Sequence, residues 1–196
     1  MPYIAPKDRE HFELWISKII EIIIESAGSK HEKIFEALSG VVIKLLEEVT
    51  PEQRYWTLAL NSGILHNIGD EMRARLKVNP GALLEDPYTH NIEIEEKLLT
   101  YIIMLAGEIR KISAKYGGGS SYAGLTNYCC TVITLRVIQK AMGNTPKFAL
   151  LSKLPSLFYK LSDHYYKSAA RPYENAQISK NGDLPEYQDI INKLGL

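Results

Sequence analysis

The chain has 196 residues, of which 45% are apolar and 23% are charged, and its 23 lysines and arginines balance its 23 aspartates and glutamates. This length and composition fit one globular domain and exclude a disordered chain. The zero net charge removes the positive field with which most nucleic-acid-binding proteins attract phosphate, so nucleic acid is not an expected partner.

The cysteines and the first residues bear on the compartment. Cys129 and Cys130 are adjacent within an apolar helical pattern, where a mutual disulfide would be strained, and no CxxC spacing indicates a metal or redox site. The start of the chain does not read as a signal peptide, and the apolar run Ile19 to Ile24 is interrupted by Glu21 and is too short to span a membrane. We therefore expect a cytoplasmic protein without a membrane partner.

The first two predicted helices follow closely on one another. Asp8 is placed to cap a helix that ends at Gly28, and Ser29 is placed to cap the next one. Apolar residues cover more than one side of the first helix. That breadth favours either a central helix or one that packs on another subunit.

Two further helices are predicted on either side of a loop. The stretch Thr50-Pro51-Glu52-Gln53 combines a capping threonine, a proline at the first helical position and a capping-box glutamine, and is the strongest helix start in the chain. The helix that it opens extends to Leu76. A loop rich in proline and glycine then spans 78–90, and a fourth helix covers about 91–115.

The second half continues the helical pattern. A fifth helix is expected from about 121 to 143, and a sixth, opened by Thr145-Pro146 and divided at Pro155, extends to 170. The polar stretch after Arg171-Pro172 predicts irregular structure as far as 183, before a short last helix. The chain is therefore predicted to be all-α: a helical bundle of about six to seven helices with an irregular C-terminal tail, in a single domain over 1–196.

Few side chains are spaced for chemistry. His66 and Asp70 lie one turn apart and could supply two metal ligands, but such pairs are common on exposed helix faces. Glu93 and Glu96 have the ExxE spacing with which all-α nucleotide pyrophosphohydrolases hold magnesium, although acidic residues are also what the start of a helix favours. No metal site and no cofactor are predicted.

Two features of the second half remain as candidate binding surfaces. The run Gly117-Gly118-Gly119-Ser120-Ser121 precedes a helix, as an anion-binding loop would, but neither a preceding strand nor a following lysine supports that function, and a linker is the better interpretation. The second half is also rich in tyrosine, whose apolar ring and polar hydroxyl suit interfaces and stacking pockets.

Three segments resemble an uncharacterised family of small phage and prokaryotic proteins. The first is the opening Met1-Pro2-Tyr3-Ile4, and the last is the segment 165–175, ending in Pro-Tyr-Glu-Asn, followed by Asn181-Gly182-Asp183. Between them, Gly124, Asn127, Tyr128 and Thr131 match a central Gly-x-x-Asn-Tyr-x-x-Thr pattern, in which this chain has Leu125-Thr126 where the family has Glu-Leu.

The resemblance implies a mostly helical protein of viral or mobile-element type, acting in the host cytoplasm if viral, and it implies no catalytic role. It covers the first residues and about 116–187, so that 1–115 reads as a helical expansion and 116–196 as the family-like, tyrosine-rich part. Segments that recur together predict a shared ligand or interface site, formed by Asn127, Tyr128, Tyr166, Arg171, Tyr173, Glu174 and Asp183.

The residues and the resemblance lead to two functional hypotheses. The first is a non-enzymatic helical binding or interaction protein that forms a homodimer and takes a protein or small molecule as ligand through its second half. The alternative is a metal-dependent nucleotide (pyro)phosphohydrolase that uses carboxylates of the third and fourth helices. The sharpest structural expectation is that Asn127 and Tyr128 contact the tail between Arg171 and Asp183.

Overall fold

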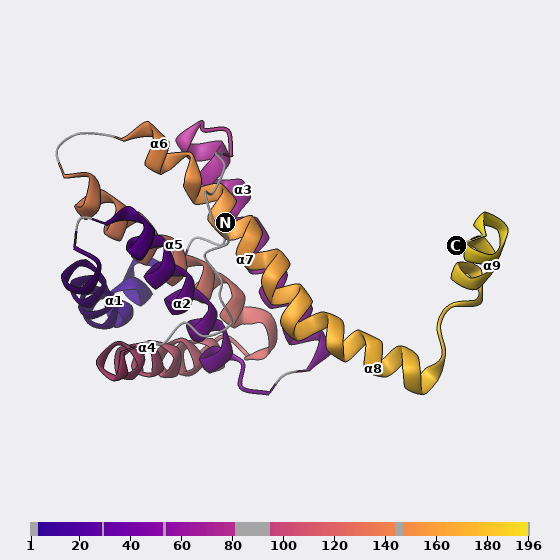
Figure 1. Ribbon diagram of the computed structural model, residues 1–196. Helices are drawn as coiled ribbons and strands as arrows, with labels where there is room; N and C mark the ends of the chain where they lie inside the picture. The colour runs from indigo at the N-terminus through magenta and orange to yellow at the C-terminus, as the bar shows by residue number, and fades with distance from the viewer. Residues whose placement is uncertain (1–3, 29, 53, 81–94, 144–146, 196) are drawn as a thin grey trace.

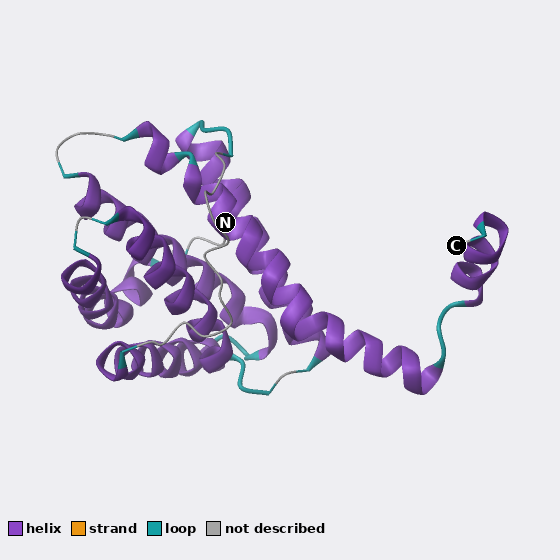
Figure 2. Ribbon diagram, in the orientation of Figure 1, coloured by secondary structure: helices purple, strands orange, loops and turns teal. Residues whose placement is uncertain are grey.

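The computed structural model describes residues 4–28, 30–52, 54–80, 95–143 and 147–195. Within these ranges 87% of the residues are helical and none forms a strand, so the predicted all-α fold is confirmed (Figure 2). The elements in chain order are α1 (Pro6–Ala27), α2 (His31–Val49), α3 (Tyr55–Leu76), α4 (Glu96–Lys115), the 3₁₀ turn η1 (Gly119–Ser121), α5 (Tyr122–Met142), α6 (Phe148–Leu151), α7 (Lys153–Tyr165), the π-helical turn η2 (Tyr166–Ala170), α8 (Arg171–Asn181) and α9 (Pro185–Leu194).

Helix α1 packs on three other helices of the body. Its apolar residues recur every three or four positions, and Phe12, Ile16 and Ile23 are fully buried. It packs on α2, α4 and α5, which also pack on one another. The apolar side chains of Ile19, Ile22 and Ile23, which face more than one side of α1, are therefore covered within one chain, whereas Leu14 is exposed.

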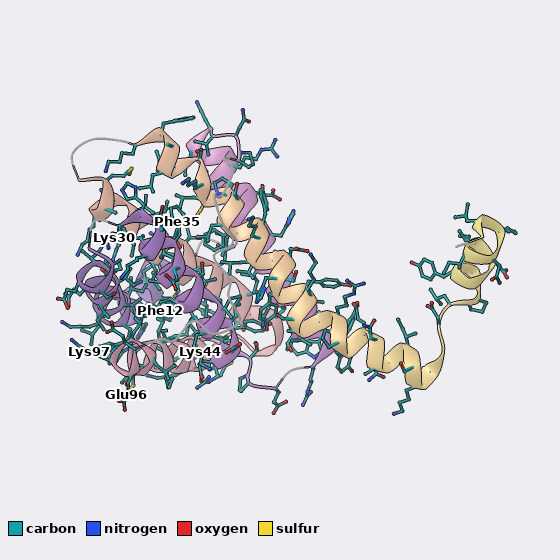
Figure 3. The ribbon with its side chains drawn as sticks, in the orientation of Figure 1. Phe12, Lys30, Phe35, Lys44, Glu96 and Lys97 are labelled. Atoms are coloured by element: carbon teal, nitrogen blue, oxygen red, sulfur yellow. The ribbon has the colours of Figure 1, made fainter. Side chains whose placement is uncertain are left out.

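The side chains follow this arrangement. Figure 3 shows Phe12 and Phe35 within the body, whereas Lys30, Glu96 and Lys97 extend from its surface. Proline at the first position of α1 and Gly28, with a φ of 57°, bound the helix as expected. Asp8, however, caps nothing with its side chain: it is buried, and its carboxylate accepts a hydrogen bond from the hydroxyl of Tyr116.

Helices α3 and α7 form a second layer. They pack on each other more extensively than any other pair of described helices, and they rest on the body through α5 and α2 (Figure 1). The two helices approach closely at Gly69, where an added Cβ would lie 2.8 Å from Cε1 of Tyr159. Further along the same contact, the hydroxyls of Ser62 and Ser162 lie 3.0 Å apart.

The predicted start of α3 is wrong. Thr50 ends α2 instead, because its backbone N–H and its hydroxyl both donate to the carbonyl of Leu46, at 3.0 and 2.8 Å. Helix α3 begins at Tyr55, where Oγ1 of Thr57 accepts the N–H of Arg54 at 3.1 Å. A capping threonine can serve either helix at a short junction, and here tertiary contacts of its hydroxyl select the preceding one.

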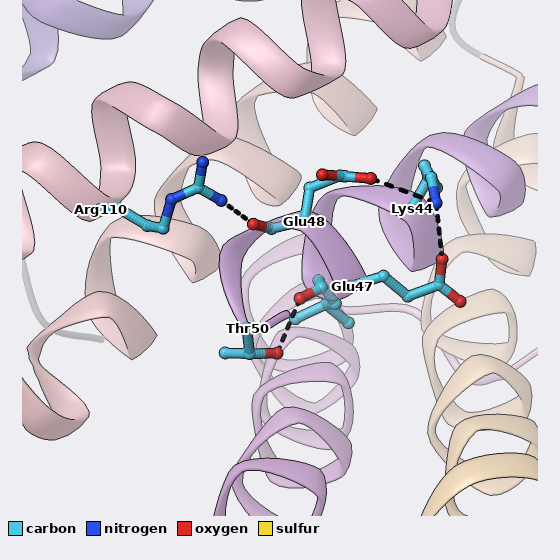
Figure 4. A network of polar contacts seen from close by, with 6 residues as sticks. Lys44, Glu47, Glu48, Thr50 and Arg110 are labelled. Atoms are coloured by element: carbon cyan, nitrogen blue, oxygen red, sulfur yellow. Dashed lines mark hydrogen bonds and ion pairs between the residues drawn. The ribbon is translucent and has the colours of Figure 1, made fainter. Parts of the chain in front are cut away.

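Polar contacts hold the end of α2 in place (Figure 4). Arg110 of α4 donates to the carbonyl oxygen of Glu48, one of the last carbonyls of α2. Lys44 forms ion pairs of 3.2 Å with both Glu47 and Glu48. These contacts fix the junction from which Thr50 reaches into the body.

A buried hydrogen-bond network joins the two layers. Asn61 is fully buried, and its Nδ2 donates to Oγ1 of Thr50 at 2.8 Å and to the hydroxyl of Tyr165 at 3.0 Å. The hydroxyl of Tyr122 donates to Oδ1 of Asn61 at 3.2 Å. One asparagine thus connects the end of α2 with α3, α5 and α7.

The predicted irregular tail is also wrong over 171–181. Residues 171–181 form α8, which continues the line of α7 through η2 and extends away from the body (Figure 1). Pro172 would normally end a helix, because its ring clashes with the carbonyl four residues earlier. The π-turn immediately before α8 widens the backbone at this point, so the helix continues.

Several expectations fall outside the described ranges. They are the capping role of Ser29, the capping-box Gln53, most of the loop 78–90 and the helix start at Thr145-Pro146. Helix α4 is described from Glu96 onward, and the fifth helix lies where the sequence places it.

Candidate interaction surface

Asn127 lies against α3 and not against the C-terminal segment. Its Nδ2 donates to Oδ1 of Asn67 at 3.0 Å, and its Oδ1 accepts the hydroxyl of Thr131 at 3.4 Å. The side chain is buried, as expected for a residue that joins two segments. The segment that it joins to α5 is the middle of α3.

Tyr128 points to a different neighbour, as consecutive helical residues must. Its ring lies 6.4 Å from that of Phe12, centroid to centroid, and the guanidinium of Arg9 lies 5.7 Å from the same ring. Burial raises the pKa of the Tyr128 hydroxyl. The expectation that Asn127 and Tyr128 contact the stretch 171–183 is therefore wrong: both lie on the body side of the molecule.

Four other predicted residues do come together, at the base of α8. The hydroxyl of Tyr166 donates to Oε2 of Glu174 at 2.6 Å, across the π-turn. Tyr173 stacks on Tyr55 of α3, with ring centroids 5.8 Å apart. Arg171 is close enough to Tyr166 to lower the pKa of its hydroxyl, although the hydrogen bond to Glu174 has the larger effect and raises it.

Tyr55 is the member of this group that sequence reasoning missed. Its hydroxyl also bonds to the carboxylate of Glu174, and this bond raises the pKa of Tyr55. We call Tyr55, Tyr166, Tyr173 and Glu174 the arm base, because they tie the start of α8 to α3. The signal for Tyr55 was weak, since it lies more than a hundred residues before the tyrosines that it joins.

Asp183 lies at the other end of α8, away from the arm base. Its Oδ1 accepts the backbone N–H of Leu184 at 2.8 Å, after Gly182 with a φ of 86°. This turn redirects the chain from α8 into α9. The seven predicted site residues therefore occupy three separate places: the α3–α5–α1 side of the body, the arm base and the turn at Asp183.

Beyond that turn, α9 presents an apolar face with no cover in the described structure. We call α8 and α9 together the arm; no residue of α8 is buried, and every described side chain of α9 is exposed. The α9 face consists of five side chains that are 37–65% exposed: Leu184, Tyr187, Ile190, Ile191 and Leu194. Its last four members follow the i, i+3, i+4, i+7 spacing of one helix side.

His66 and Asp70, one of the pairs considered for metal chemistry, pack against α7. His66 and Asp70 lie 3.7 Å apart at the surface, the hydroxyl of Tyr159 donates to Oδ1 of Asp70 at 2.7 Å, and the rings of His66 and Tyr159 lie 5.1 Å apart. These contacts bridge α3 and α7. In the part of the chain that the structure describes, no group of three His, Cys, Asp or Glu side chains is placed to hold a metal ion. Glu93 lies outside that part, and Glu96 is exposed at the first turn of α4.

The glycine run is an ordered turn. Gly117, Gly118 and Gly119 all have positive φ values, and the N–H groups of Gly117 and Gly118 donate to the last carbonyls of α4, at 3.2 and 3.0 Å. The hydroxyl of Ser121 bonds to Ser113. Because these amides are already paired within the turn, the geometry offers little to an anion.

The cysteines are core residues, as predicted. Both are fully buried free thiols, and burial raises the pKa of Cys130 to about 12 and that of Cys129 well above its usual value. A thiol that stays protonated at neutral pH is a poor nucleophile and a poor metal ligand.

No protein-family model, curated protein or solved structure matches this chain. The resemblance to the uncharacterised phage and prokaryotic family accordingly remains a hypothesis. Among the described helices, none is both long enough and apolar enough to cross a membrane.

Proposed function

We propose that this protein is a non-enzymatic helical binding protein and that its arm is the binding element. The observation that carries the proposal is the α9 face, an apolar side of a helix that extends from the body and stays exposed among the described residues (Figure 1). A surface helix with one apolar side is the element that other proteins bind in a groove.

The length of α9 supports the same function. An isolated helix of ten residues is marginally stable in water, because helix nucleation is costly and few hydrogen bonds repay it. Docking of the α9 face would supply the missing stabilisation, so that the helix and its binding partner support each other. The arm base contributes a fixed starting point, which reduces the entropy lost on binding.

The resemblance adds the expected setting. It favours a viral or mobile-element protein that acts in the cytoplasm of a host cell, where a binding partner could be another copy of the chain, a different protein or a small molecule. None of these expectations depends on catalysis. The alternative, a metal-dependent nucleotide hydrolase, would need a third acidic or imidazole ligand near His66 and Asp70 or beside Glu96.

Site-specific photo-crosslinking tests the proposal. A photoreactive phenylalanine analogue at Tyr187, on the α9 face, is expected to form adducts with a polypeptide in cells that make the protein, whereas the same analogue at Asn192, on the polar side of α9, is expected to form far fewer. Equal or absent adducts at the two positions would contradict the proposal.

A thermal-shift series separates the alternative. The melting temperature in the presence of Mg²⁺, Mn²⁺ and a nucleotide panel should stay unchanged for a binding protein of the proposed kind. A hydrolase would be stabilised, because any ligand specific for the folded state raises the melting temperature.

A further inference from the structure

We infer that the partner of the α9 face is a second copy of this chain, and that it binds α9 on an apolar patch formed by α1 and α4. The inference rests on the proposed function, in which α9 is the binding element, and it adds the identity and the surface of the partner. The two copies would exchange their arms around a twofold axis.

The receiving surface lies where α1 and α4 pack side by side. The rings of Trp15 and Tyr101 lie 6.3 Å apart across the two helices. Next to Trp15 on α1, Leu14 is 56% exposed, and Met104 on α4 is 50% exposed. Because Tyr101 and Met104 are three residues apart on one helix, they share a side of α4. Leu14, Trp15, Tyr101 and Met104, which we call the α1–α4 patch, form the acceptor for the α9 face.

The surroundings of the patch suit a short helix. Lys18 and Glu21 form an ion pair of 2.8 Å on one side, and Lys111 and Glu108 form one of 3.0 Å on the other. Because these charges are already paired with each other, docking would have to desolvate fewer unpaired charges there. Gly107 follows one turn after the patch, and an added Cβ there would meet nothing within 4 Å, so a second helix can approach the backbone closely.

The arm points away from the body, so α9 does not reach the α1–α4 patch of its own chain. Figure 1 shows α1 and α4 at one end of the molecule and α9 at the other, with α8 extending away from the body. The arm base holds that direction through the Tyr166–Glu174 hydrogen bond and the stacking of Tyr173 on Tyr55. The patch of another copy can be reached without breaking either contact.

The areas match what a stable dimer needs. Half of an apolar side chain amounts to on the order of 50–100 Å², so the five side chains of the α9 face offer about 400 Å² and the four of the α1–α4 patch about 300 Å². In a reciprocal exchange each copy contributes both surfaces, and the contribution of about 700 Å² per partner is within the range of stable interfaces.

A membrane surface fits the α9 face less well. Helices that bind anionic membranes carry lysine and arginine on their polar side. The polar side of α9 has Glu186 and Asp189 against the single cation Lys193. A protein surface with little charge is therefore the better match.

Light scattering during gel filtration, on the purified full chain, tests the inference. The wild type is expected to have twice the monomer mass of 22.2 kDa at micromolar concentration. Ile190→Glu in the α9 face and Met104→Glu in the patch should each raise the dimer Kd by at least about a hundredfold, because each change places a charge in both copies of the contact. The matched controls Asn192→Glu and Ala114→Glu, at exposed positions outside both surfaces, should leave the Kd unchanged.

A mixing experiment makes the test specific. In a dimer of either variant alone, every arm–patch contact has one altered surface. In a mixed dimer of Ile190→Glu and Met104→Glu chains, the unaltered arm of one chain meets the unaltered patch of the other, which restores one complete contact. Mixed dimers should therefore form more readily than dimers of either variant alone. A dimeric Met104→Glu variant, a mass that keeps rising beyond the dimer, or wild-type sedimentation with phosphatidylserine vesicles would overturn the inference. A monomeric wild type that still forms adducts through Tyr187 with a different protein would also overturn the inference, while leaving the proposed function intact. The absence of any adduct would contradict both the inference and the proposed function.

Discussion

Asn61 is the residue on which most of the buried polar contacts between the two layers depend. Replacement by alanine would leave the hydroxyl of Tyr122 without its buried partner, and would leave Tyr165 with its bond to Thr50 alone. An unpaired buried group costs about 1–3 kcal/mol, so Asn61→Ala should lower the free energy of unfolding by about that amount. Urea unfolding measures this loss. Asn192→Ala, at an exposed position, is the control and should cost less than about 0.5 kcal/mol.

The same network makes stability sensitive to alkaline pH. Burial raises the pKa of Tyr122 from 10.0 to about 12, and burial also raises the pKa of Tyr165. The folded protein therefore holds these protons more tightly than the unfolded chain does, and the stability present below pH 10 is lost as the pH rises from about 10 to about 12.

The variant Tyr122→Phe separates this effect from general alkaline unfolding. Phenylalanine cannot ionise, so the free energy of unfolding should fall less between pH 9 and pH 11 in the variant than in the wild type. Urea titrations at the two pH values measure the difference. An equal fall in both proteins would show that Tyr122 does not contribute.

At the residue scale, the sequence predicted which side chains form contacts better than it predicted the residues that they contact. Tyr166 and Glu174, two of the seven residues expected to form one site, do bond to each other. Asn127 was correctly expected to be a buried joining residue, but its partner is Asn67, sixty positions away. Nothing local in a sequence specifies which distant helix faces a given side chain, and Tyr55 was missed for the same reason.

At the scale of elements, two glycines of α3 offer a matched comparison. An added Cβ at Gly63 would meet nothing within 4 Å, whereas at Gly69 it would lie 2.8 Å from Tyr159 and 3.3 Å from the carbonyl oxygen of Pro155. Gly63→Ala should therefore raise the free energy of unfolding by up to about 1 kcal/mol, through better helix propensity. Gly69→Ala should lower it by about 1–3 kcal/mol, because α3 and α7 must move apart. Thermal or urea unfolding decides between the signs, and a stabilising Gly69→Ala would contradict the close approach.

Helix existence was predictable and helix boundaries were less so. The buried faces of α1, α2 and α5 have the spacing that marks a helix in the sequence, and α1 and α5 end at glycines, Gly28 and Gly143. The start of α3 was displaced because Thr50 bonds to α2 and to the distant Asn61. Helix α8 was not predicted because its polar composition and Pro172 both argue against a helix. Nothing in the sequence indicated the π-turn that accommodates the proline.

At the scale of the whole molecule, α9 and the body should be independent in stability. No residue of α8 is buried, and every described side chain of α9 is exposed. In the Met104→Glu background, which is expected to be monomeric, deletion of 183–196 should change the free energy of unfolding by less than about 0.5 kcal/mol. Urea unfolding of the two chains measures this change. A larger loss would mean that α9 stabilises its own body.

The contact between α3 and α7 also has a consequence for the order of folding. Ser62 and Ser162 bond although they are 100 positions apart in the chain. Closing a loop of this length costs about 4 kcal/mol in chain entropy before any contact across it repays the cost, so α7 should dock after the local pairs of the body have formed. Removing a hydroxyl there, in Ser62→Ala, should accelerate unfolding in stopped-flow experiments and leave the refolding rate almost unchanged. The helix that carries the arm would then be the last to join the folded body and the first to leave it.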